Sequence, residues 1–395
     1  MKMTEQTTRP CFACGCGEFE WLFPLVWRLP NGNPLPQRAM VGTCRYCGAI
    51  SCHSSATQTD LRDYYAANVN YLRSNAVGMG GEDGRRYVAA LSLLERHSPQ
   101  KGLSALDIGC GQGGFLRCLC DNGWTSPTGL DLNRANVSGL RKAGFNVFLG
   151  DICDQPLAPR SVGTVFAMHI FEHVYDMQTA LYECARVLVP QGLLYVEVPD
   201  AAGYPACSDA PLGDFIQEHI NHFDASALVM CLESRGFELL ETGKKSLPNG
   251  CGGDTCLYGI FRNSGRLARH SFTRERVRER QLTDLYDRHC AHMDSLARQC
   301  HCAGRVCIWG LSSYMQLVWA ELEMRGVCID GLFDASPQKQ VAWKFGPLPV
   351  QPPESIRTTM AEGQEGFLLL PAGRSEKSMR NFLQASAFAG RALFV

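Results

Sequence analysis

Two pairs of cysteines near the start of the chain have the spacing of metal ligands. They are Cys11-Phe-Ala-Cys14 and Cys44-Arg-Tyr-Cys47, and a β-hairpin over residues 21–28 and 38–43 would join them. In each pair two thiolates can point at one ion, and two pairs supply the four sulfur ligands that a structural Zn2+ site prefers. We therefore expect a zinc ribbon with no open position for catalysis. The alternative is that Cys16 or His53 replaces one of the four ligands.

A glycine-rich turn follows a short apolar run in the first half of the chain. Leu103–Ile108 is typical of a buried strand, the turn is Gly109-Cys110-Gly111-Gln112-Gly113-Gly114, and Phe115–Asn122 begins a helix. The glycines also fit G-x-G-x-x-G, the pattern of dinucleotide-binding folds. Asp107, however, stands directly before them, where a carboxylate would repel a pyrophosphate. The turn therefore favours a cationic ligand over a nicotinamide dinucleotide.

Two further carboxylates follow the next two predicted strands. Asp131 comes after the strand Pro127–Leu130, about 20 residues beyond the turn, where a carboxylate can accept both hydroxyls of a ribose. Asp151 follows the strand 146–149 and can accept from an adenine amino group, with Ile152 as an apolar neighbour. The carboxyl ends of parallel strands meet at one edge of a sheet, so these groups should line one ligand site.

The best candidates for acid/base chemistry are Glu218, His219 and His222. They follow the fifth predicted strand, Leu194–Val198, at the edge of the sheet where such folds bind ligands. Histidine suits proton abstraction near neutral pH. The alternative is that these polar residues only cap the helix that follows them. Glu172-His173 form a rival pair.

The order of these motifs resembles that of the class I S-adenosylmethionine-dependent methyltransferases. Residues 106–113 look like their first motif, Asp131 like their ribose acid, 150–152 like their adenine motif, 165–173 like their fourth-strand motif and 185–194 like the stretch before their fifth strand. The resemblance covers residues 101–263 and implies S-adenosyl-L-methionine as cofactor. It implies as cofactor-binding residues Asp107, Gly109, Cys110, Gly111, Gly113, Asp131, Leu132, Asp151, Ile152 and His169.

The whole chain is similar in layout to the sugar C-methyltransferases, which act on nucleotide-linked 4-keto-deoxysugars. The resemblance implies that a base removes the proton beside the keto group and that the enolate carbon attacks the sulfonium methyl. His219 would be the base, Glu218 would orient it or bind the sugar, and Tyr71 would lie on a lid near the methyl group. His222 is a further catalytic candidate.

The chain also departs from that family. A tyrosine usually stands shortly before the Glu-His pair, where this chain has Phe215 and Ile216, and a Gly-Gly-Ser segment is present only as Gly252-Gly253-Asp254. The substrate can therefore differ. Transfer to oxygen or nitrogen of a sugar or natural product is the alternative reaction. A catalytically degenerate binding module is the alternative of another class.

The predicted fold is α/β with three parts and two connectors. We expect a zinc ribbon over 1–60, a helical connector or lid over 61–100, the methyltransferase domain over 101–263, a helical linker over 264–303 and a smaller Rossmann-like domain over 304–395. The last domain either closes over a sugar nucleotide, with Ser312, Ser313 and Asp334 as contacts, or serves packing and dimerisation. It has only Gly310 of the usual glycine set, which argues against NAD. The cysteines and histidines of 289–302 fit no standard ligand spacing.

Composition excludes several other classes of protein. A chain of 395 residues is longer than one hydrophobic core usually organises, so we expect more than one domain. A net charge of -1 gives no overall positive potential to attract nucleic acid or an anionic membrane. Without a long apolar stretch or a signal peptide, the twenty cysteines predict a reducing cytoplasm. We expect a small-molecule partner, a nucleotide sugar, while the oligomeric state stays open.

Overall fold

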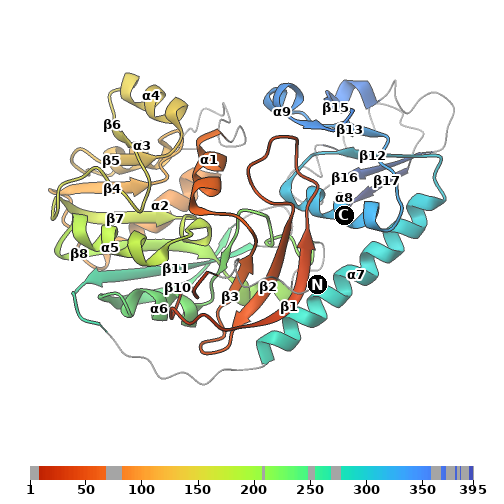
Figure 1. Cartoon of the computed structure of the whole chain (residues 1–395). Helices are drawn as coiled ribbons and strands as arrows, with labels where there is room; N and C mark the ends of the chain where they lie inside the picture. The colour runs from red at the N-terminus through yellow and green to blue at the C-terminus, as the bar shows by residue number, and fades with distance from the viewer. Residues whose placement is uncertain are drawn as a thin grey trace.

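The structure, a computed structural model, describes residues 9–67, 82–206, 210–247, 254–267, 277–356, 366–370, 379, 383 and 391–394. It contains three sheets, which lie side by side in Figure 1. The central sheet and its helices are on the left, the N-terminal strands are in the middle, and the C-terminal sheet is on the right.

The N-terminal sheet is antiparallel, with the strand order β1-β2-β3-β9. Its strands are β1 (Phe19–Val26), β2 (Arg38–Cys44), β3 (Ile50–His53) and β9 (Asn221–His222). The first two form the predicted hairpin, and alternate residues of β1 such as Phe23 and Leu25 are buried. β9 comes from a distant part of the chain, because Ile50 pairs with His222.

The central sheet has the order β10-β11-β8-β7-β4-β5-β6. The strands are β4 (Ser104–Ile108), β5 (Thr128–Asp131), β6 (Asn146–Leu149), β7 (Val162–Met168), β8 (Leu188–Pro199), β10 (Phe237–Leu247) and β11 (Asp254–Asn263). Neighbouring strands from β8 to β6 pair in parallel, and β11 is antiparallel to both of its neighbours. β4 and β7 are short apolar runs buried on both faces, as expected for a sheet covered by helices.

Helices connect these strands. They are α1 (Gln58–Ala67), α2 (Glu82–Glu95), α3 (Gly114–Asp121), α4 (Arg134–Lys142), α5 (Met177–Val187) and α6 (Ala225–Glu233), with the short 3-10 helices η3 (Phe171–His173) and η4 (Ala201–Ala206). Side-chain caps fix several of their starts: Asn133 accepts from two amides at the start of α4, and Asp224 caps α6. Asn133 follows β5 and Asp224 follows β9, so each cap fixes where the loop after its strand ends and the next helix begins.

The C-terminal sheet has the order β14-β15-β13-β12-β16-β17. It follows the long helix α7 (Val277–His301) and consists of β12 (Arg305–Trp309), β13 (Gly331–Phe333), β14 (Lys344–Phe345), β15 (Leu348–Gln351), β16 (Gly366–Leu370) and β17 (Arg391–Phe394), with α8 (Ser313–Met324), α9 (Pro337–Ala342) and η5 (Pro353–Ser355). All of its pairings are parallel except that of β14 with β15. The predicted α/β class with Rossmann-like parts is confirmed.

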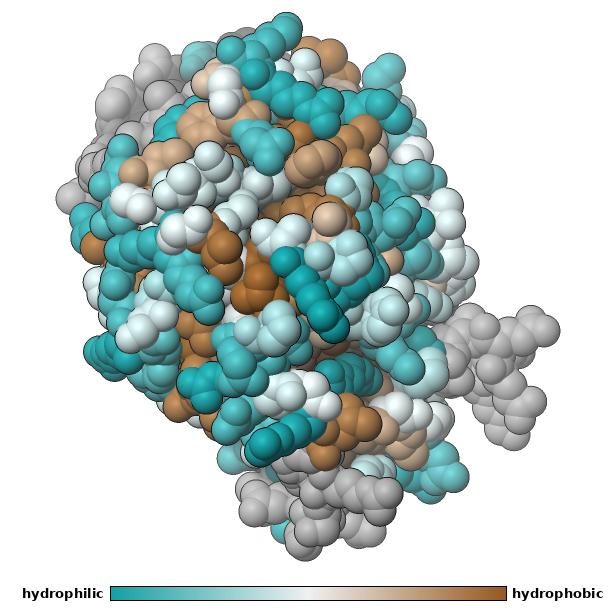
Figure 2. Space-filling view, turned by 90° about the vertical axis from the view of Figure 1, so that its left-hand side faces the viewer, coloured by the Kyte–Doolittle hydropathy of each residue, from teal (hydrophilic) through white to brown (hydrophobic). Residues whose placement is uncertain are grey.

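The N-terminal sheet packs against the C-terminal part of the chain. Phe23 stacks on Tyr286 of α7 with ring centroids 4.5 Å apart, and the Arg28 amide donates to the Gln316 carbonyl of α8 over 2.9 Å. One continuous hydrophobic core joins these elements. The side of the molecule shown in Figure 2 is mostly polar, with hydrophobic residues visible in recesses near its centre. Among the described residues no helix is long and apolar enough to cross a membrane.

Candidate active site

A pocket of about 510 Å³ opens at the carboxyl ends of β4, β5, β6 and β7. Its lining includes most of the predicted cofactor residues: Asp107, Gly109, Gly111, Asp131, Leu132, Asp151, Ile152 and His169. Cys110 and Gly113 are outside that lining. Cys110 is buried. Gly113 has a left-handed backbone conformation and is the N-cap residue directly before α3, where a Cβ would clash with the Leu140 side chain.

The glycine turn is shaped by two positions that require glycine. Gly109 has a φ of +70°, and a Cβ there would lie 2.3 Å from the Ile170 side chain. Gly111 has a φ of +50°, and its amide donates to Oδ2 of Asp131 over 2.8 Å. The turn therefore brings the backbone close to the pocket and orients the ribose acid.

Two carboxyl groups at the floor of the pocket are held in an environment that disfavours their charge. Burial, followed by the neighbouring charge of Asp131, raises the pKa of Asp107 well above its usual range. Burial also raises the pKa of Asp131, although the amides of Asn133 and Gly111 donate to it. A cation bound in the pocket would favour the ionised forms, which suits a ligand that carries a sulfonium and an ammonium group.

Asp151 pairs with a side chain of helix α1, which comes before the strands of the central sheet in the sequence. Its Oδ1 accepts from the Cys153 amide over 2.7 Å, and its Oδ2 lies 2.5 Å from Nε of Arg62 in α1. Arg62 and Gln58 also line the pocket. Sequence reasoning missed Arg62, because nothing in the sequence of α1 shows that it lies beside Asp151, the residue shortly after β6.

Arg86 of α2 is the second pocket residue that sequence reasoning missed. Its Nε donates to the buried Glu197 over 2.9 Å, and Lys245 also pairs with Glu197. Burial by itself would raise the pKa of Glu197, but the charges of Arg86 and Lys245 outweigh it and lower the pKa to about 2. Glu197 therefore holds Arg86 at the pocket wall as a permanent cation.

The two rival acid/base pairs of the sequence come together beside the pocket. Ligand atoms of Glu172, His173 and His219 lie within 4.8 Å of one another, and we call these three residues the His–Glu cluster. His173 lines the pocket, while His219 lies behind it, with ring centroids 4.9 Å apart. His169 contacts the cluster, with Nδ1 at 3.1 Å from Oε1 of Glu172.

Backbone carbonyls fix the tautomers of both cluster histidines. Nδ1 of His173 lies 3.0 Å from the Glu218 carbonyl, and Nδ1 of His219 lies 3.0 Å from the Asp214 carbonyl. A carbonyl only accepts, so Nδ1 carries a hydrogen in each ring, and in the neutral form of each ring the lone pair is on Nε2. Burial lowers the pKa of His219 to about 3, so that imidazole is neutral.

The other predicted catalytic residues lie elsewhere. Glu218 is buried, and its backbone carbonyl contacts the cluster by accepting a hydrogen bond from Nδ1 of His173. His222 is buried between Cys52, with Sγ at 3.2 Å from Nε2, and Tyr204, with its hydroxyl at 3.1 Å from Nδ1. It is outside the lining of the pocket. Tyr71 lies outside the described residues.

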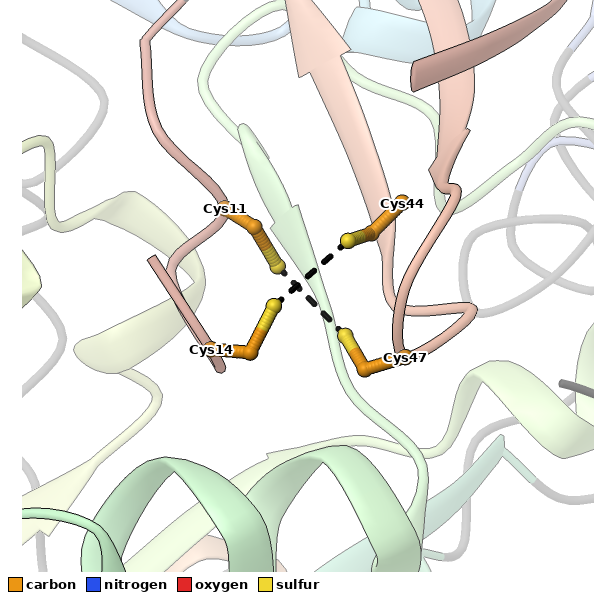
Figure 3. A group of neighbouring side chains, drawn as sticks. All are labelled: Cys11, Cys14, Cys44 and Cys47. Atoms are coloured by element: carbon orange, nitrogen blue, oxygen red, sulfur yellow. Dashed lines mark hydrogen bonds between the residues drawn. The ribbon is translucent and has the colours of Figure 1, made fainter. Parts of the chain in front are cut away.

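The four N-terminal cysteines converge on one point, as Figure 3 shows. The sulfurs of Cys11 and Cys47 lie 3.6 Å apart, and those of Cys14 and Cys44 lie 3.5 Å apart. A tetrahedral zinc with bonds of about 2.3 Å would separate its sulfurs by about 3.8 Å, so the four residues fit this ion. Cys16 and His53, the alternative ligands, are outside this group of four.

The C-terminal part shows no comparable site among its described residues. Asp334 accepts from the Leu311 amide over 2.9 Å and from Lys339 over 3.1 Å, and Ser312 caps α8. These contacts already engage two of the side chains expected to meet a nucleotide. Among the described residues, the clusters of side chains that could bind a metal ion include no residue of 289–302.

Comparison with known proteins gives a consistent assignment for the central part. A family model described as "Methyltransferase domain" matches residues 82–242. A Mycolicibacterium smegmatis protein named "Probable S-adenosylmethionine-dependent methyltransferase" is 32% identical over 36% of this chain and 54% of its own length. The dTDP-3-amino-3,6-dideoxy-alpha-D-glucopyranose N,N-dimethyltransferase of Streptomyces fradiae is 28% identical over 43% of this chain and 70% of its own.

The chain spans about half the length of the first of these curated relatives. Among solved structures, an S-adenosylmethionine-dependent methyltransferase from Mesorhizobium loti aligns with 17% identity and a TM-score of 0.38, over 46% of this chain and all of its own. The range of the family model includes the His–Glu cluster and the pocket residues from Arg86 onward. The chain thus contains a class I S-adenosylmethionine-dependent methyltransferase domain.

Proposed function

We propose that this protein transfers the methyl group of S-adenosylmethionine to a carbon of a nucleotide-linked 4-keto-deoxysugar. The observation that carries the proposal is the position of the His–Glu cluster directly beside a pocket whose carboxylates suit the cofactor. Two imidazole lone pairs at that place can act on the acceptor while the sulfonium lies within the same pocket.

The cofactor would be held by groups that complement each of its parts. Asp131 would accept from the ribose hydroxyls, Asp151 and Ile152 would meet the adenine, and Arg86 would pair with the methionine carboxylate. Asp107 would accept from the ammonium group, which would stabilise its ionised form.

The reaction would form one carbon–carbon bond and break one carbon–sulfur bond. The carbon beside the keto group gives up its proton at the His–Glu cluster, and the resulting enolate carbon attacks the sulfonium methyl. The electron pair of the broken bond stays on sulfur, which becomes a neutral thioether. Removal of the proton beforehand makes the carbon nucleophilic enough for the transfer.

The choice of a sugar nucleotide is supported by two observations. The chain has an N-terminal cysteine site, the methyltransferase domain and a C-terminal α/β sheet in the order of the sugar C-methyltransferases. One relative that matches 43% of the chain acts on a dTDP-linked amino sugar, although it methylates nitrogen. We further infer that the four cysteines hold a structural zinc ion.

Proton exchange tests the carbanion step. In D2O the protein should introduce deuterium beside the keto group of a dTDP-4-keto-deoxysugar when no methyl donor is present. Methylation of that sugar without any such exchange under any condition would argue against a free enolate. Methylation of a hydroxyl or amine in a parallel screen with labelled donor would replace the acceptor but keep the transferase.

A further inference from the structure

Ligand atoms of the three residues of the His–Glu cluster lie within 4.8 Å of one another, which is close to the spacing of a metal site. We propose that Glu172, His173 and His219 bind one divalent transition-metal ion, with open positions for an oxygen of the methyl acceptor. This inference rests on the proposed function, because it names the means by which the same site activates its acceptor.

The first argument is the convergence of acceptor atoms. The Glu172 side chain is 1% exposed, and neither of its oxygens has a hydrogen-bond partner of good geometry among the described residues. Nε2 of His173 lies 4.0 Å from Oε1 of Glu172. Nδ1 of His169 lies 3.1 Å from Oε1 without good hydrogen-bond geometry, and a buried carboxylate so poorly supplied with donors is costly unless a cation compensates its charge.

The second argument is the orientation of the two imidazoles. Each ring donates its Nδ1 hydrogen to a backbone carbonyl over 3.0 Å, which leaves Nε2 as the nitrogen available for an ion, and that of His173 lies 4.0 Å from Glu172. Metal-ligating histidines have this arrangement, because the hydrogen bond of the second nitrogen fixes both tautomer and ring direction. Small side-chain rotations would bring ligand atoms now within 4.8 Å to the separation of about 3 Å that bonds near 2.1 Å require.

The third argument is that the backbone around the cluster is held rigidly. The Ile220 amide donates to the Glu172 carbonyl over 2.9 Å, which ties the loop of His219 to η3. Asn221 donates to the carbonyls of Phe171 and Val174 over 2.9 Å and 2.7 Å. The segments that carry the three ligands are therefore fixed in relation to one another before any ion binds.

The ligand set selects the class of ion. Two imidazoles and one carboxylate suit divalent zinc, cobalt, manganese or iron better than magnesium or calcium, which prefer oxygen ligands. Three protein ligands leave at least one position open, unlike the closed site of four cysteines. An ion of charge +2 beside Glu172 leaves one positive charge, which an ionised acceptor oxygen would neutralise.

The ion would activate the acceptor by binding its oxygen. A metal-bound oxygen ionises at lower pH than a free one, and a bound keto oxygen stabilises the charge of an adjacent enolate. His219 would then be a ligand of the ion instead of the base that the family resemblance implies, and a hydroxide bound at a second open position would take the proton beside the keto group. His173, which lines the pocket, would place the ion next to the cofactor.

Cobalt titration tests this assignment on the full chain loaded with one equivalent of zinc. We expect Co2+ to give ligand-field absorption without thiolate charge-transfer bands, at one ion per chain beyond the zinc. Glu172→Gln and His219→Asn should each weaken Co2+ binding by at least about tenfold. His97→Asn is the matched control, because His97 and Glu241 form a 2.9 Å pair away from the cluster and should leave Co2+ binding unchanged.

Calorimetric binding of S-adenosylmethionine is measured on the same samples. If the wild-type chain binds the cofactor but no second ion, or if both variants bind Co2+ as tightly as the wild type, the metal inference is wrong and the transferase proposal stands. If the wild type does not bind S-adenosylmethionine, the proposed function itself is wrong. If Glu172→Gln or His219→Asn no longer binds S-adenosylmethionine, His173→Gln takes its place in the Co2+ titration.

Discussion

Nε of Arg62 lies 2.5 Å from Oδ2 of Asp151, so the helix α1 is anchored to the strand end that we assign to adenine recognition. Gln58, Arg62 and Tyr65 of α1 all line this part of the pocket. The pair therefore links the sheet edge to a helix that forms part of the pocket wall.

We expect Arg62→Gln to raise the dissociation rate of S-adenosylmethionine by about two- to fivefold. The side chain of Arg62 is 41% exposed, and a partly exposed ion pair contributes only about 1 kcal/mol or less. Stopped-flow displacement measures the rate. Arg45→Gln, which removes a surface pair with Glu20 on the N-terminal sheet, is the control, and equal rates for all three proteins would contradict the role of α1.

Arg86→Gln should weaken binding of S-adenosylmethionine about 10- to 100-fold. A hydrogen bond between charged groups is worth about 1.5–3 kcal/mol, and Arg86 is placed to make one with the methionine carboxylate. Calorimetry gives the affinity, and thermal unfolding shows whether the loss of the Glu197 pair has disturbed the fold. The neighbouring Arg85 is exposed, so Arg85→Gln should bind as the wild type does. Unchanged affinity in Arg86→Gln would place the carboxylate elsewhere.

Cys44→Ser should reduce the zinc content of the purified chain to well below one ion and lower its thermal midpoint. The Cys44 sulfur belongs to the group of four, and three remaining thiolates bind zinc less tightly. Cys16→Ser is a strict control, because Cys16 lies close by in sequence but outside that group. Elemental analysis distinguishes them. Equal zinc in both variants would show that another residue completes the site.

His289→Leu should remove part of the acid sensitivity of the fold. Burial, followed by the charges of His292 and Arg325, lowers the pKa of His289 to about 4 from 6.5. The unfolded chain therefore binds this proton at higher pH than the folded chain does. The stability that depends on neutral His289 is full above pH 6.5 and declines as the pH falls toward 4.

The size of this effect follows from the two pKa values. Between pH 7 and pH 5 the wild type should lose about 2 kcal/mol more free energy of unfolding than His289→Leu does. Urea unfolding at the two pH values measures the difference. The exposed His301, whose charge is not among those that act on His289, supplies the control, and a His301→Gln variant should keep the acid sensitivity of the wild type. A variant at His289 with the same pH dependence as the wild type would show that this ring has the same pKa in the folded and the unfolded chain.

The cofactor half of the site could be predicted from the sequence because its determinants are local. A glycine turn after a buried strand fixes a short stretch of backbone, and Asp131 ends the adjacent strand, so their hydrogen bond follows from the strand order alone. Arg62 and Arg86 could not be predicted in this way. Each lies on a helix whose placement over the sheet depends on tertiary packing.

The acceptor half shows the same limit more clearly. Glu172-His173 and His219 were rival candidates in the sequence, since some 45 residues separate them. Hydrogen bonds from His173 to the Glu218 carbonyl and from Ile220 to the Glu172 carbonyl bring them together. Such pairing of two irregular segments has no periodic signal in the sequence. His219 and His222 were grouped by proximity, but the fold places His222 in β9, against Cys52 of the N-terminal sheet.

The pairing of β9 with β3 also sets an order for folding during synthesis. The N-terminal sheet lacks its fourth strand until residues 221–222 have left the ribosome, although the cysteine site needs nothing beyond Cys47. A nascent chain can therefore bind its metal early, yet His219, two residues before β9, can take its place only after this late strand addition. Such non-local pairing slows folding, so we expect the acceptor side of the site to mature after the cysteine site.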